Sequence, residues 1–197
     1  MSDHTVLISN WLKILNLYQK DKPFSIILNG ADESIFSDSK NKAWQKLEPL
    51  KIVTHHWSSN KMKGFDVYKK LDELVISESW RGKIQFTFIG NLPKDFNFKN
   101  TKVVKPISGK KLADELSNHH VYITASKNEP AGMHHIEGVL SGLPVIYRNS
   151  GALPEYCKYY GVSFNYLEFI PALNEMIRNY NFYKSNLKNY PNTSSRM

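Results

Sequence analysis

Two acidic residues flank a short turn in the second half of the chain, and their spacing suits the binding of a polyol. Glu129 and Glu137 lie within residues 126–137, which read SKNEPAGMHHIE. An apolar run at residues 121–124 precedes this stretch, and a helical pattern follows it. A strand, a turn and a helix start form an anion site, because the first helix amides lack internal partners and carry the positive dipole end. Carboxylates accept hydrogen bonds from sugar hydroxyls. The stretch therefore predicts a pocket for a phosphate flanked by polyols, such as a nucleotide sugar.

The wider stretch resembles the E-x7-E signature of retaining GT-B-fold glycosyltransferases of family four. The typical form is E-P-x-G-L-x-x-x-E-A, followed by small residues, by G-x-P-V and by a Gly-rich turn that ends in Glu. Here the first part reads EPAGM at residues 129–133, and the later parts read GLPV at 142–145 and SGALPE at 150–155. The resemblance implies that the chain contains the C-terminal, donor-binding domain of such an enzyme. It also implies that Glu155 lies near the donor.

The resemblance assigns roles to the residues around the two acids. Glu129 is expected to contact hydroxyls of the transferred sugar, and Glu137 is expected to receive the ribose hydroxyls. The backbone amides of Gly132, Met133 and His134 are expected to face the phosphate or the sugar. The alternative for Glu129 is an acid favoured by a helix dipole, and for Glu137 it is a solvated helix position.

A Lys-Gly pair lies at some distance before this stretch in the sequence. Lys63 and Gly64 resemble the K-G of the family, whose Lys contacts the donor diphosphate and whose Gly lets the backbone come close. The chain departs from the family at the preceding G-R-L, because the position of that Arg is occupied by Ser58. Lys61 or Arg148 is then expected to supply the missing charge. The alternative for Lys63 is one more surface lysine.

Two adjacent histidine pairs, at residues 55–56 and 134–135, lie next to these segments. Their spacing does not match the i, i+4 arrangement of helical zinc ligands, so polar residues at the pocket rim are expected and no metal site. G-x-G-x-x-G, the Walker G-x-x-x-x-G-K-[ST] and D-x-D are all absent from the sequence. No cofactor or metal is therefore predicted, and the substrate is expected to be a nucleotide sugar, with UDP as the family default.

Alternating strand and helix patterns must position these residues. They predict an α/β fold with a doubly wound, parallel, Rossmann-like sheet of six strands, the C-terminal half of a GT-B fold. Under the order 3-2-1-4-5-6, the ligand site lies between the first and fourth strands, where the loops at residues 57–64 and 126–132 meet. The expected strands are residues 51–56, 84–89, 103–104, 121–124, 145–147 and 162–164. The expected helices cover residues 11–18, 65–75, 110–118, 135–141, 167–180 and 182–190.

The chain divides into four parts. In the resembled family N-G-x-D marks the crossing between the two halves, and NGAD at residues 29–32 matches it. Residues 1–36 are therefore interpreted as a remnant of the acceptor domain with the crossing, and 37–49 as a linker. Residues 50–190 form the nucleotide-sugar-binding domain, and 191–197 are expected to be disordered. The alternative for the first part is a generic start to a single domain.

Composition narrows the partners. The 197 residues carry a net charge of +8, which suits a polyanionic ligand, an anionic membrane surface or nucleic acid, although a lysine surplus also keeps a protein soluble. No nucleic-acid motif is present, so specific nucleic-acid binding is not expected. Cys157 is the single cysteine, which fits a reducing compartment. No signal peptide or membrane-length apolar run is found. A cytoplasmic protein is expected, with peripheral membrane contact left open.

The resemblance implies a retaining glycosyltransferase that moves a hexosyl group from a nucleoside-diphosphate sugar. Lys63 and Glu129 are the residues expected to act at the reacting sugar and diphosphate, and no protein nucleophile is assigned. The acceptor is a glycan, a lipid-linked sugar or a protein, and its base would come from an N-terminal acceptor domain or a partner chain. Alone, this chain is expected to be inactive or weakly hydrolytic. The alternative is a non-catalytic nucleotide-sugar-binding or regulatory module.

Overall fold

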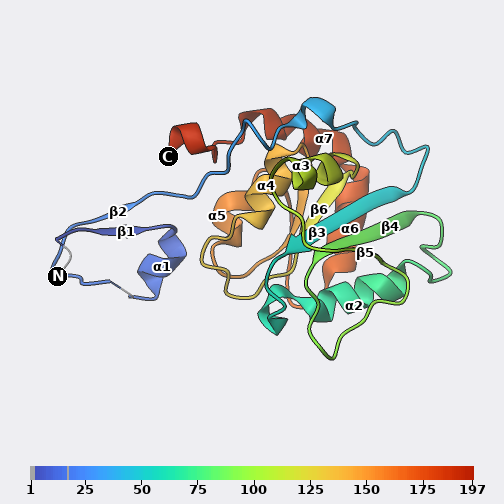
Figure 1. Ribbon diagram of the computed structural model, residues 1–197, viewed down its shortest axis with the longest axis horizontal. Helices are drawn as coiled ribbons and strands as arrows, with labels where there is room; N and C mark the ends of the chain where they lie inside the picture. The colour runs from blue at the N-terminus through green and yellow to red at the C-terminus, as the bar shows by residue number, and fades with distance from the viewer. Residues whose placement is uncertain (1–2, 17) are drawn as a thin grey trace.

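A parallel sheet of six strands forms the centre of the computed structural model, which describes residues 3–16 and 18–197 (Figure 1). Its order is β5-β4-β3-β6-β7-β8, which is the order 3-2-1-4-5-6 counted from the first strand of this sheet. The predicted doubly wound fold is confirmed. The strands are β3 (Leu50–His56), β4 (Ile84–Gly90), β5 (Lys102–Val104), β6 (Val121–Thr124), β7 (Val145–Arg148) and β8 (Gly161–Phe164).

Helices cover both faces of this sheet, as its apolar strands require. A parallel sheet buried on both faces has near-continuous apolar strands, and neighbouring residues such as Ile52 and Val53 enter opposite cores. One core contains side chains of α3 (Gly109–Ser117), α4 (His134–Leu140) and α5 (Leu153–Cys157). The other contains side chains of α2 (Phe65–Leu74), α6 (Phe169–Arg178) and the start of α7 (Tyr180–Asn186). Among residues 3–16 and 18–197, no helix is long and apolar enough to span a bilayer.

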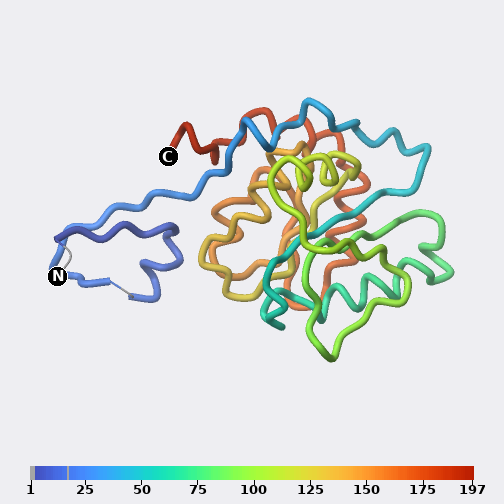
Figure 2. Tube along the Cα trace, viewed as in Figure 1, coloured from blue at the N-terminus to red at the C-terminus, as the bar shows by residue number. Residues whose placement is uncertain are grey.

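The N-terminal residues form a separate small unit beside the sheet (Figures 1 and 2). Strands β1 (Thr5–Leu7) and β2 (Phe24–Ile26) pair in parallel, with α1 (Asn10–Ile14) between them. The helix is shorter than the expected span of residues 11–18, because Asn16 already has a left-handed φ of 55°. Residue 17 of that expected span lies outside the described residues.

Helix α5, which the sequence pattern did not predict, attaches this unit to the main sheet. The Glu155 carboxylate accepts hydrogen bonds from the backbone amides of Asn10 (2.8 Å) and Trp11 (2.7 Å), and from the Asn10 side chain (3.0 Å). The Tyr156 hydroxyl donates to the Ile8 carbonyl at 2.7 Å. For Glu155, which was expected near the donor, the observed partners are the groups at the N-terminus of α1.

The last residues of the chain are also held, although disorder was expected for 191–197. The Ser194 amide donates to the Ala31 carbonyl at 2.9 Å, and the Ala31 amide donates to the Asn192 carbonyl at 3.3 Å. The Ser194 hydroxyl donates to Glu33 at 2.8 Å. No sequence pattern indicates this pairing, because both segments are short and polar and lie far apart in the chain. A 3-10 turn, Ser194–Arg196, follows the pairing.

Replacing Glu155 by alanine should loosen the N-terminal unit without unfolding the sheet. The change removes a charged acceptor from two amides that start α1, and loss of such a cap costs about 0.5–2 kcal/mol. Hydrogen exchange of the Asn10 and Trp11 amides should accelerate by about tenfold. Glu78→Ala, at an exposed position in the α2–β4 connection, is the control. Equal exchange in the two variants would contradict a holding role for Glu155.

Candidate functional site

The loops that follow β3 and β6 meet at the carboxyl ends of the two central strands. The Lys127 amide donates to the Met62 carbonyl at 2.7 Å, which joins the two loops directly. Gly64 has a φ of +93°, and a Cβ at this position would lie 2.3 Å from the Ala125 carbonyl oxygen. Only glycine permits both this backbone conformation and this close approach. The convergence of the two distant loops that the strand order predicts is therefore present.

Lys63 and Glu129 face each other across this junction. The ammonium nitrogen of Lys63 lies 2.6 Å from a carboxylate oxygen of Glu129, and the side chains are 24% and 8% exposed. An ion pair that is partly shielded from water is stronger than one on the surface. The two residues that the sequence assigned to the reacting centre are thus in contact, and each neutralises the other.

The second acid of the signature is held by a different partner. Glu137, in the first turn of α4, accepts a hydrogen bond from His55 Nε2 at 2.7 Å. The other ring nitrogen of His55, Nδ1, lies 3.1 Å from the Tyr122 hydroxyl. His55 ends a buried strand, and the sequence had given it no role beyond the pocket rim. Its proximity to Glu137 depends on how α4 packs on the sheet, which the residue pattern does not show.

A cavity of about 410 Å³ is lined by Lys63 of the first pair, but not by Glu129, and by both members of the second pair. It brings together five of the predicted residues, namely Lys63, Gly132, Met133, His134 and Glu137. Its other lining residues are His55, His56, Trp57 and Ser58. Trp57 is 60% exposed, and sequence reasoning passed over it although it is an aromatic residue directly after a central strand. Lys63 provides the only fixed positive charge among the lining residues, all of which the structure describes.

Three buried histidines near the cavity, His56, His134 and His135, are uncharged at neutral pH. Burial is the main cause that lowers the pKa of His56 and of His134 well below the usual range, and it lowers the pKa of His135 to about 3. The Thr124 hydroxyl lies 2.9 Å from His134 Nε2, and the Tyr68 hydroxyl lies 2.7 Å from His56 Nε2. These rings can exchange hydrogen bonds but cannot add positive charge for a phosphate. Within the described residues, no group of three or more His, Cys, Asp or Glu is placed to hold a metal ion.

Neither residue expected to replace the missing arginine reaches the cavity. Lys61 pairs with Asp95 at 2.8 Å, and its side chain is 76% exposed. Arg148 is buried and lies 3.3 Å from Asp66, which also pairs with Lys127. For Lys61 the cause is the 3-10 turn Lys61–Lys63, in which Lys61 and Lys63 pair with different partners. The cavity therefore has Ser58 where the resembled family has arginine and no substitute cation from these two residues.

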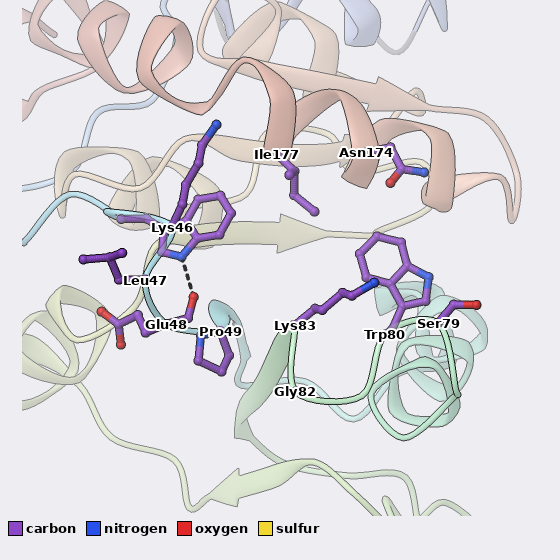
Figure 3. Close-up of a pocket in the computed structure, with 11 residues that line it drawn as sticks. Lys46, Leu47, Glu48, Pro49, Ser79, Trp80, Gly82, Lys83, Asn174 and Ile177 are labelled. Carbon is purple, nitrogen blue, oxygen red and sulfur yellow. Dashed lines mark hydrogen bonds between the residues drawn. The ribbon is translucent and has the colours of Figure 1, made fainter.

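A larger cavity, of about 610 Å³, lies at the other end of the sheet. Figure 3 shows it between the segments that lead into β3 and β4 and helix α6, with Trp80 on one side and Lys46 on the other. None of the residues predicted for the site lines it. Open α/β sheets bind ligands beyond the carboxyl ends of their strands, whereas this cavity lies at the amino ends. The smaller cavity is therefore the candidate site.

No family model matches the sequence, and no curated protein matches it either. Solved structures do match its fold. Sucrose-phosphate synthase from Thermosynechococcus elongatus superposes with a TM-score of 0.72 at 15% identity, over 96% of this chain and 54% of its own. Anabaena Alr3699/HepE, solved with UDP-glucose, gives 0.72 at 14%, over 96% and 58%. WaaG, a glycosyltransferase involved in lipopolysaccharide biosynthesis, gives 0.72 at 13%, over 97% and 59%.

At such low sequence identity, these superpositions show a shared fold and nothing more. The shared fold is the Rossmann-like fold of the C-terminal domain of GT-B glycosyltransferases, as predicted from the sequence. The chain spans only 54% to 59% of the length of these three proteins.

The buried histidines make stability depend on pH. A histidine whose pKa is lowered in the fold stays neutral there, while the unfolded chain takes up its proton below about pH 6.5. Stability is therefore complete above pH 6.5 and decreases as the pH falls toward 3, the pKa of His135. His135→Phe should flatten the dependence of the unfolding free energy on pH by about 1 kcal/mol per pH unit between pH 6 and 5. Urea titrations at several pH values measure this, and parallel curves for variant and wild type would contradict it.

Proposed function

We propose that this chain is the donor half of a retaining glycosyltransferase, which binds a nucleoside-diphosphate sugar for hexosyl transfer. The observation that carries the proposal is the Lys63–Glu129 pair beside a cavity that Lys63 and Glu137 both line. The site offers an ammonium group next to two carboxylates, which matches a phosphate between two polyols. UDP-sugars are the first candidates, because the fold neighbours solved with a nucleotide hold UDP or UDP-glucose.

Donor binding would exchange partners within the ion pair. The Lys63 ammonium would turn to the diphosphate, and the Glu129 carboxylate would then accept hydrogen bonds from hydroxyl groups of the transferred sugar. The exchange leaves the Lys63 charge paired with the diphosphate and the Glu129 carboxylate hydrogen-bonded, which matters because Glu129 is almost fully buried and a buried charge without partners is costly. Before the donor binds, the two groups are paired with each other.

Catalysis would rest on stabilising the departing diphosphate. Lys63 lines the cavity together with Gly132, Met133 and His134, which lie where α4 begins. Fixed donors aimed at developing negative charge are the largest single contribution in many enzymes, and loss of one costs about 100–1000-fold in rate. A phosphate oxygen of the donor would take the proton of the acceptor, so this proposal needs no nucleophile from the protein.

The acceptor would bind to a domain that the described residues do not form. Strands β1 and β2 make a two-stranded parallel sheet, and such sheets are normally covered on both faces and only marginally stable alone. Val6 is 55% exposed and Ile14 is 73% exposed on this unit. An acceptor domain, in the same polypeptide or in a partner chain, would cover this surface and present a glycan, a lipid-linked sugar or a protein.

One observation favours the alternative of a non-catalytic nucleotide-sugar-binding module. The resembled enzymes have an arginine where this chain has Ser58, and Lys61 and Arg148 lie elsewhere. A single lysine stabilises a departing diphosphate less than a lysine and an arginine together. Release of glucose from UDP-glucose by this chain combined with an acceptor domain would establish the enzyme. Binding without turnover in that complex would establish the module.

Lys63→Ala should weaken UDP-glucose binding at least about tenfold, because a charged hydrogen bond to phosphate is lost. Isothermal titration calorimetry measures the dissociation constant directly. Lys61→Ala is the matched control. It removes the same kind of charge two residues before Lys63, from a side chain that pairs with Asp95 instead. Its affinity should stay within about twofold of wild type. Unchanged binding by Lys63→Ala, or equal losses in both variants, would remove Lys63 from the site.

A further inference from the structure

The side chain of His55 links the sheet to the acid expected to bind ribose. One ring nitrogen, Nε2, lies 2.7 Å from a Glu137 carboxylate oxygen, and the other, Nδ1, lies 3.1 Å from the Tyr122 hydroxyl. Tyr122 is fully buried in the adjacent strand β6, and the His55 side chain is 5% exposed. His55 and Tyr122 are therefore both on central strands and not on loops. Side chains on strands are held in position more precisely than side chains on loops.

The directions of the hydrogen bonds that connect Tyr122, His55 and Glu137 follow from which of these groups can donate. The backbone amide of His55 donates to the Tyr122 hydroxyl at 3.1 Å. That hydroxyl can donate its own hydrogen to His55 Nδ1. Nε2 then carries the ring proton, and it donates to the Glu137 carboxylate, which can only accept. The imidazole thus holds one carboxylate oxygen in place.

Glu137 is left with acceptor capacity while one of its oxygens is held by His55. Its second oxygen, and the remaining lone pair of the first, are not used by His55, and the residue lines the cavity. An oriented carboxylate of this kind is matched by two neighbouring hydroxyl donors. A ribose offers 2′ and 3′ hydroxyls, whereas a 2′-deoxyribose offers only one of them.

From this geometry we infer that His55 is a positioning residue: its hydrogen bond orients Glu137, the acid that the resemblance assigns to the ribose hydroxyls, and so strengthens the preference of the site for a nucleotide that carries both of them. The inference rests on the proposed function and narrows its substrate class. A site built to hydrogen-bond a hydroxyl rejects the analogue that lacks it, because the site's buried polar group is left unpaired. His55 acts at the ribose end only, since Lys63 and Glu129 form their own pair.

The test compares the dissociation constants of UDP and 2′-deoxy-UDP, measured by calorimetry on the whole chain. Wild type should prefer UDP by at least about tenfold. His55→Leu, which cannot donate to Glu137, should reduce the preference to about threefold or less. His55→Gln places an amide donor near the position of Nε2 and should recover part of the preference. Tyr122→Phe removes only the hydroxyl that orients the ring, and its preference should fall between those of wild type and His55→Leu.

The matched control is His119→Leu, which removes another buried histidine, one that bonds to a main-chain carbonyl outside the cavity. Its preference for UDP should equal that of wild type. An equal loss of both affinities in His55→Leu, with their ratio unchanged, would overturn the positioning role. Should His55→Leu fail to fold, the ratio in Tyr122→Phe decides, and a wild-type ratio there would overturn it as well.

The two levels of the proposal fail differently. If wild type binds UDP and 2′-deoxy-UDP equally well, nucleotide binding stands and the recognition of the ribose is wrong. If wild type binds neither nucleotide, the proposed function is wrong, and the inference about His55 falls with it.

Discussion

The site depends on the close approach of two backbone segments that are far apart in the sequence. Gly64 lies against the Ala125 carbonyl, and the Lys127 amide bonds to the Met62 carbonyl. This contact brings the Lys63 ammonium to the Glu129 carboxylate. Without it the two loops would separate and the cavity would lose the pair at its edge. A side chain at position 64 would need a strained φ and would also meet the main chain of the partner loop.

Charge is balanced narrowly in this cavity. Lys63 is compensated by Glu129, Glu137 adds a second carboxylate, and His56, His134 and His135 are held neutral by burial. A diphosphate bound here would therefore meet one ammonium and not a cluster of cations. In the proposed function, much of the selectivity would then come from directed hydrogen bonds such as those of Glu137, which His55 orients. Binding at such a site would depend more on recognition of the polyol than binding at a phosphate site with several cations.

The sheet could be predicted from sequence because buried parallel strands read as short apolar runs between turn residues. The meeting of the two loops then followed from the strand order, since ligands bind where that order reverses. Side-chain partners could not be predicted in the same way. Lys61 and Lys63 are two residues apart in one basic turn, and only the packing shows that one turns to Asp95 and the other to Glu129.

The contacts that short polar segments make with distant parts of the chain also could not be predicted from the sequence. The pairing of Ser194 with Ala31 and the contact of Glu155 with α1 involve exposed or half-exposed polar groups, whose patterns match many arrangements. His55 was visible as one of an adjacent pair, but its bond to Glu137 depends on the packing of α4 against β3 and β6. Residue type and spacing predict which groups can act. They do not show which neighbour holds each group.

The turn at residues 150–155 connects the site to the N-terminal unit. The Ala152 amide donates to the Glu129 carbonyl at 2.8 Å, and a Cβ on Gly151 would lie 2.3 Å from the same oxygen. Three residues further on, Glu155 holds the start of α1. A single short segment therefore contacts the main chain of Glu129 and holds the N-terminal unit, which in the proposed function would join an acceptor domain. Because packed segments shift as rigid pieces and do not deform smoothly, a movement of that unit would reach Glu129 through this turn. Donor and acceptor halves would then be coupled through main-chain contacts, without any loop having to span the cleft between them.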